Sequence, residues 1–228
     1  TPLMDPGVFL LILSLLDGIL IVMVMNLLSD AGCALAATDG NDWQALVVGD
    51  TNRFFAMNGE FDAPGYLVSS DSGGKMPIYA ACKGSSLYVA TTAAGGFSDD
   101  RFLFVTDTLG DAHPAPWAKS GQVFFDTSTK PFMGGEGDGG FEAWHNVVAD
   151  IANWPNAMEG ELNLIDAFGS VPEAVYVAAV SYGTADGSGV TSQGPAAWDA
   201  DNEIQIMEFL RVPLNSVRDE NLDGHFDG

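Results

Sequence analysis

The order of apolar and polar residues divides the chain into one continuous apolar stretch and a longer, punctuated region. Residues 8–28 are apolar except for Ser14, Asp17, Gly18 and Asn26. A helix rises about 1.5 Å per residue, so this stretch would span about 30 Å, the thickness of a bilayer's hydrocarbon core. After residue 37 the apolar runs are short and are separated by Gly, Pro, Asn and Asp, which is typical of strands joined by turns.

The punctuated region predicts a mainly β fold, a jelly-roll-like antiparallel β-sandwich preceded by one N-terminal hydrophobic α-helix. Residues 101–105 and 175–180 are apolar on both faces, which predicts strands in the middle of a sheet. We divide the chain into a membrane or assembly helix with its linker (1–36), the sandwich (37–217) and a C-terminal tail (218–228). We predict strands at residues 44–48, 53–57, 66–69, 78–82, 86–91, 101–106, 122–126, 161–165, 174–181 and 203–210, and a short helix at 142–151.

One face of the N-terminal segment carries small and polar side chains. Ser14, Asp17 and Gly18 lie at i, i+3 and i+4, which places them together on a helix. A carboxylate in the middle of a membrane costs about 2.5–3.5 kcal/mol, so we expect this face to contact protein. A secretory signal peptide is an alternative, because residues 31–36 are small as in a cleavage region, although no Lys or Arg precedes Arg53.

The N-terminal layout also resembles that of type IV pilins. Asp5 is followed by some twenty apolar residues and then by the β-rich region. Pro6 and Gly7 depart from that layout, since pilins continue the helix there. The resemblance implies an extracellular filament subunit whose apolar helix forms the filament core.

Four short motifs give the β-rich region a second resemblance. They are Asp-Gly-Asn-Asp-Trp at 39–43, Ser-Leu-Tyr-Val-Ala-Thr at 86–91, Asp-Asp-Arg-Phe-Leu-Phe-Val-Thr-Asp at 99–107, and Glu-Ile-Gln-Ile-Met-Glu-Phe at 203–209, which precedes Val-Pro-Leu at 212–214. In this order, over residues 39–217, they resemble the CBM9/DOMON-like group of extracellular β-sandwiches. Members of that group bind sugars, haem or calcium, or serve as structural modules, so the resemblance implies a fold without selecting one function.

Charge and composition narrow the classes of function. With 31 acidic and 8 basic residues the chain has a formal net charge of -23, which repels phosphate backbones and excludes nucleic acid as a partner.

Cys33 and Cys82 allow at most one disulfide and no cysteine-based zinc site. Few Lys residues and loops rich in Asp and Gly favour an extracytoplasmic location. The sequence contains no H-E-x-x-H, G-x-S-x-G or P-loop motif, and we predict that the protein is not an enzyme.

The C-terminal tail carries the pattern of a calcium loop. Oxygen ligands occupy positions 1, 3, 5 and 9 of such a loop, with glycine at 6 and a backbone carbonyl at 7. Calcium binds six to eight oxygens, and the odd positions of a tightly turning loop direct them inward. The predicted metal residues are therefore Asp219, Asn221, Asp223, His225 (through its carbonyl) and Asp227, with a structural Ca²⁺ as cofactor.

Two tryptophans beside proline are the candidate binding residues. Trp117 follows Pro116 and Trp154 precedes Pro155, and a proline-flanked loop can hold an aromatic ring rigidly toward a sugar or a partner.

Together these features predict a non-enzymatic, calcium-stabilised structural or accessory subunit outside the cytoplasm, in the periplasm or at the cell surface. Its N-terminal helix would fix it in a membrane or multi-subunit assembly, so the expected partners are other protein subunits. Two alternatives remain open: a carbohydrate-binding surface or secreted module with a glycan as partner, and a pilin-like filament subunit.

Overall fold

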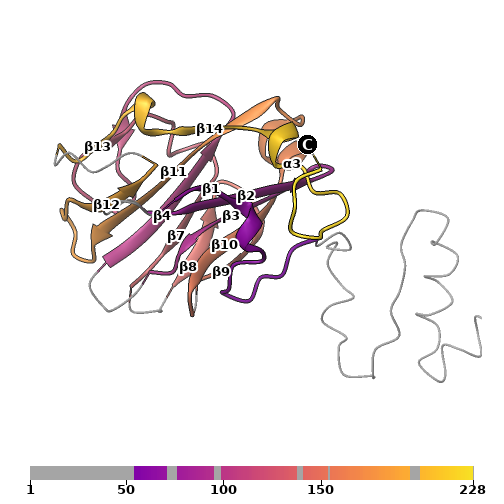
Figure 1. The fold of residues 1–228 in the computed structure, drawn as a ribbon. Coiled ribbons are helices and arrows are strands. Elements are labelled where there is room, and N and C mark those ends of the chain that lie inside the picture. Colours follow the sequence, from indigo (N-terminus) through magenta and orange to yellow (C-terminus); the bar gives the residue numbers. More distant parts are fainter. Residues whose placement is uncertain are drawn as a thin grey trace, which may run out of the picture. The chain divides into compact units, whose positions relative to one another are not determined.

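The computed structural model describes residues 54–70, 76–94, 99–137, 141–153, 155–195 and 201–227 (Figure 1). The chain divides into two compact units, Thr1–Arg53 and Phe54–Gly228, and all described residues belong to the second. The predicted N-terminal helix with Ser14, Asp17 and Gly18 lies outside the described residues, as does Trp154. Within the described part, no helix is long and apolar enough to cross a membrane.

The second unit is mainly β, as predicted, and two antiparallel sheets form a sandwich-like core. Sheet A has five strands in the order β1 (Leu67–Ser69), β2 (Ile78–Lys83), β3 (Ser86–Thr92), β10 (Ala157–Asn163) and β9 (Asp150–Ala152). Sheet B has six: β12 (Val190–Gly194), β11 (Ala174–Gly183), β4 (Asp99–Thr106), β7 (Phe132–Gly135) and β8 (Glu142–His145) in order, with β14 (Leu210–Pro213) also paired to β11. The two strands predicted to be central, β4 and β11, pair with each other inside sheet B.

A third, small sheet and four short helices complete the described part of the unit. Sheet C joins β5 (His113–Pro114), β6 (Gln122–Val123) and β13 (Glu203–Ile204), and its β6–β13 pair is parallel. The helices are η2 (Pro64–Tyr66), α3 (Leu164–Phe168), η3 (Ile206–Glu208) and η4 (Leu214–Val217).

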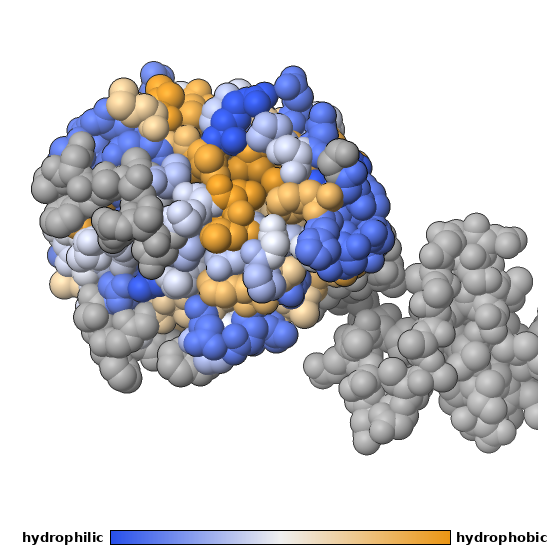
Figure 2. Space-filling model, viewed as in Figure 1, coloured by the Kyte–Doolittle hydropathy of each residue, from blue (hydrophilic) through white to orange (hydrophobic). Residues whose placement is uncertain are grey.

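The main core lies between sheets A and B and follows from the alternation of side chains along each strand. Leu87 and Val89 of β3 and Leu103 and Val105 of β4 belong to one buried cluster. Each such side chain contributes about 1.5–3 kcal/mol on burial, which makes this cluster the main source of stability. In the region of β1 and β14, Figure 2 shows apolar residues at the surface with hydrophilic residues on several sides.

The outer face of each sheet is also covered. On sheet B, Phe102 and Phe104 of β4 pack with Val123 and Phe125, which belong to or follow β6 of sheet C. On sheet A, Tyr88 of β3 packs with residues of the segment 54–66 and of the C-terminal loop. Because both ends of the described chain lie on the outer face of sheet A, this face brings together residues far apart in the sequence.

Several predicted elements were wrong, and pairing explains the differences. Residues 142–151 are not a helix but contain β8 and the first two residues of β9, because β8 pairs with β7 and β9 with β10. The described part of the predicted strand 53–57 is not a strand, since its amides bond to side chains instead. The predicted strand 161–165 ends at Asn163, whose side chain caps α3, and 203–210 is interrupted by η3.

Candidate functional site

The C-terminal loop, residues 219–227, is fastened to the end of β2 and begins with a buried carboxylate. The Asp219 amide donates to the Cys82 carbonyl at 2.9 Å, and Asp219 itself is fully buried. Its carboxylate accepts hydrogen bonds from the Tyr66 hydroxyl at 2.8 Å and from the amides of Leu222 at 2.6 Å and Gly224 at 2.9 Å. Burial alone would raise the pKa of Asp219, but these donors together hold it below its ordinary value.

Further side chains of the loop support its turns. The Asn221 side-chain oxygen accepts from the Asp223 amide at 2.9 Å, and Asp223 accepts from the His225 amide at 2.9 Å. These are Asx turns, which bend the backbone without a helix or strand. Asp227 closes the loop by accepting from the Glu220 amide at 2.6 Å.

The five predicted calcium residues thus share one loop, but they do not surround one point. Among the described residues, no group of three or more His, Cys, Asp and Glu side chains is placed to hold a metal ion. Asn221, Asp223, His225 and Asp227 are exposed, whereas Asp219 is buried and already accepts several hydrogen bonds. The carboxylate, amide and carbonyl oxygens of the loop are of the kind that calcium binds. To reach one ion, however, the exposed side chains would have to turn toward it.

Two glutamates of β10 fasten the other end of the unit, and the sequence analysis did not identify them. Glu159 is fully buried; it accepts from the Asn58 and Gly59 amides, both at 2.7 Å, and from the Tyr88 hydroxyl at 3.0 Å. Glu161 accepts from the amides of residues 54 and 55 at 3.2 Å. The sequence feature that could have identified them is their spacing of two residues in a strand whose other face is buried. This spacing places both carboxylates on one face of the strand.

A pocket of about 290 Å³ lies between the two fastened segments. Its wall includes Phe54, Phe55 and Tyr66 from one segment and Leu222 and Asp223 from the other. Asp62 also lines it and accepts from the Ala56 amide at 3.1 Å. Burial and the charge of Glu159 raise the pKa of Asp62 to about 6, with a smaller contribution from Glu161. The pocket therefore has aromatic walls and contains a carboxylate, Asp62, whose surroundings make its ionised form less favourable.

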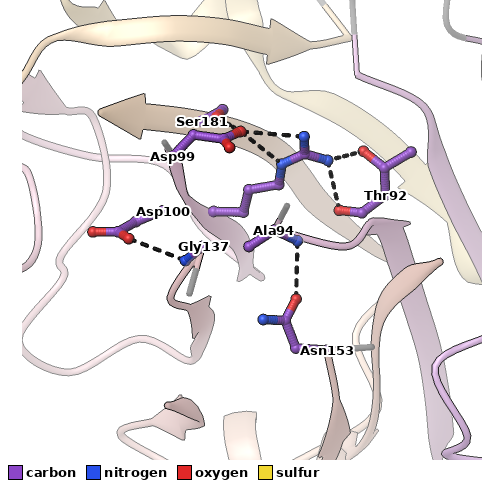
Figure 3. Close-up of polar contacts among 8 residues, drawn as sticks. Thr92, Ala94, Asp99, Asp100, Gly137, Asn153 and Ser181 are labelled. Atoms are coloured by element: carbon purple, nitrogen blue, oxygen red, sulfur yellow. Dashed lines mark hydrogen bonds and ion pairs between the residues drawn. The ribbon is translucent and has the colours of Figure 1, made fainter. Parts of the chain in front are cut away.

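A second polar cluster lies at the start of β4 and pairs the acidic residues that precede the strand's apolar run (Figure 3). Arg101 donates to Asp99 at 3.2 Å and to the Thr92 carbonyl of β3 at 2.9 Å, so it joins the two sheets. Asp100 forms an ion pair with Lys119 at 2.7 Å, and the Lys119 side chain is only 1% exposed. These carboxylates hold the fold together, which accounts for the Asp-Asp-Arg motif without a ligand.

The structure packs Trp117 against aromatic side chains. Its ring contacts Phe102 edge-on, with centroids 4.7 Å apart, and lies 5.7 Å from Phe141 and 5.8 Å from His145. Trp117 is partly buried and Phe141 is 44% exposed. The backbone at Trp117 has a φ of 53°, a left-handed conformation that is uncommon for a bulky residue. A role of Trp117 in carbohydrate binding stays a prediction.

Comparisons with known proteins do not assign the chain to a family. No protein-family model matches the chain, and no curated protein matches it significantly. The resemblances to the CBM9/DOMON-like group and to type IV pilins therefore stay predictions.

Proposed function

We propose that the protein is a non-enzymatic structural or accessory module that acts outside the cytoplasm. In this proposal the jelly-roll-like sandwich is the folded body, and the N-terminal apolar segment fixes it in a membrane or multi-subunit assembly. The supporting observation is how the buried carboxylates are used. Glu159 and Glu161 of β10 accept hydrogen bonds from amides of residues 54–59 and fasten that segment to sheet A. Asp219 accepts from amides of its own loop, and its main-chain amide bonds that loop to β2. Their charges serve to hold the chain in place rather than to act on a substrate.

The assembly role is tested by recovering the native protein in mild detergent and identifying what accompanies it. We expect a defined set of other protein subunits at fixed stoichiometry, seen by mass spectrometry and negative-stain imaging. Recovery as homopolymeric fibres would favour the filament subunit, and recovery as a lone soluble monomer would contradict the assembly role.

We also propose that the C-terminal loop binds a structural calcium ion. The ligands would be Asp219, Asn221, Asp223 and Asp227, with the main-chain carbonyl of His225. A bound ion would neutralise the carboxylates of the loop and stabilise the loop in its folded conformation. Since Asn221, Asp223 and Asp227 are exposed, their side chains have room to turn toward an ion.

Removal of calcium is expected to destabilise the protein. A ligand at a hundred times its dissociation constant stabilises by about 2.7 kcal/mol, which for a unit of this size is a shift in Tm of about 5–10 °C. We expect EDTA to produce this decrease in the unmodified chain and in the control Asp111→Asn, which removes an exposed carboxylate elsewhere. In the double variant Asn221→Ala, Asp223→Asn the decrease should vanish. A Tm of the unmodified chain that does not respond to chelator would refute calcium binding.

A further inference from the structure

The pocket beside the C-terminal loop has a composition that calcium binding does not explain. At about 290 Å³ it has room for one small group. Phe54, Phe55 and Leu222 give it apolar walls that offer a metal ion no side-chain oxygen. Its acidic residues come from both segments, Asp62 from one and Asp223 from the other.

The charge around this pocket is not balanced by the residues that line it. None of the lining residues is basic. Asp62 and Asp223 both line the pocket together with the Tyr66 ring. A cation in the pocket would be attracted by both carboxylates and by the aromatic rings beside it.

We propose that this pocket binds an alkylammonium group, presented as a lysine side chain by a partner protein. This inference rests on the proposed assembly role, because the lysine would belong to another subunit of that assembly. A lysine fits because its methylene stem covers apolar surface while its ammonium offers three donors to carboxylates from two walls. The planar guanidinium of arginine is better suited to one carboxylate in a bidentate pair. The Lys83 ammonium lies 4.9 Å from the centroid of Phe54, so one of the lining rings already has a cation beside it.

The test titrates the full chain, in mild detergent and EDTA, with Nα-acetyl-lysine methylamide and follows the heat of binding. The matched probe is Nα-acetyl-norleucine methylamide, which keeps the stem and lacks the ammonium. We expect saturable binding of the lysine probe and at least tenfold weaker binding of the norleucine probe. Asp62→Asn and Asp223→Asn should each weaken binding of the lysine probe about tenfold, whereas Asp111→Asn should leave it unchanged.

Asp62→Asn is the decisive variant because Asp62 lies outside the calcium loop and asparagine retains an acceptor for the Ala56 amide. Its thermal unfolding is recorded to show that it is folded. Equal binding of the two probes, or equal binding by Asp62→Asn and Asp111→Asn, would overturn the proposal. Tenfold tighter binding of the corresponding arginine probe would overturn the choice of lysine. Binding of the lysine probe by a chain that purifies alone would support the pocket and count against the assembly role. Failure of the pocket proposal can therefore be distinguished from failure of the proposed function.

Discussion

Replacing Lys119 by methionine is expected to destabilise the protein by about 3–5 kcal/mol, the cost of removing one partner of a buried ion pair. The Lys119 ammonium lies 2.7 Å from Asp100, and the two side chains are 1% and 7% exposed. It also donates to the carbonyls of Gly183 at 2.9 Å and Thr184 at 2.7 Å, at the end of β11 and directly after it. Methionine has a similar shape but no charge and no donor, so Asp100 would stay buried without its cation and both carbonyls would lose a donor.

The measurement is the free energy of unfolding in urea for the full chain in mild detergent. Lys130→Met is the matched control, because Lys130 pairs with Asp107 at 2.6 Å but both side chains are more than a quarter exposed. An exposed pair contributes about 0–1 kcal/mol, so this variant should change little. The double variant Lys119→Met, Asp100→Asn should lose less stability than the single lysine variant, since no buried charge is left uncompensated. If Lys119→Met costs no more than Lys130→Met, the buried pair is not a main support of this end of the sandwich.

Asp219→Ala is the second change with a large expected effect, a loss of about 3–4 kcal/mol. It removes the acceptor of the buried Tyr66 hydroxyl and of the amides of Leu222 and Gly224. A buried donor left without an acceptor costs about 1–3 kcal/mol, and hydrogen bonds to a charged group are at the strong end of the range. The C-terminal loop should then separate from the outer face of sheet A, where Phe226 stacks on Tyr66 with centroids 6.0 Å apart.

Unfolding in urea is measured in EDTA, so that calcium does not contribute to the result. Tyr66→Phe removes only one of the donors and should cost about 1–2 kcal/mol. Asp227→Ala, an exposed aspartate of the same loop, should cost less than Asp219→Ala. The pKa of Asp219 is lowered in the folded state, so its contribution is present above the unfolded pKa and is lost as the pH falls through the folded value. Asp219→Ala should therefore also remove part of the loss of stability in acid, and an unchanged acid profile would contradict this assignment.

The local pattern of the sequence was sufficient for the strands that are buried on both faces. Residues 102–105 of β4 and most residues of β11 are apolar, and that pattern predicted both their type and their place within a sheet. The Asx pattern of residues 219–227 likewise predicted an acidic turning loop, because its hydrogen bonds join residues only a few positions apart. Both predictions depend on residues that are neighbours in the chain.

Only the tertiary structure decided which distant residues meet. Residues 142–151 have no local feature that separates a short helix from two strands, and their pairing with β7 and β10 determines the outcome. Glu159 meets amides a hundred positions earlier in the chain, and Lys119 meets Asp100 and the end of β11. A long-range contact of this kind leaves no periodic trace in the sequence, because it depends on how the two sheets pack. For the same reason the pocket formed by Asp62, Tyr66 and Asp223 exists only once both ends of the described unit lie on sheet A.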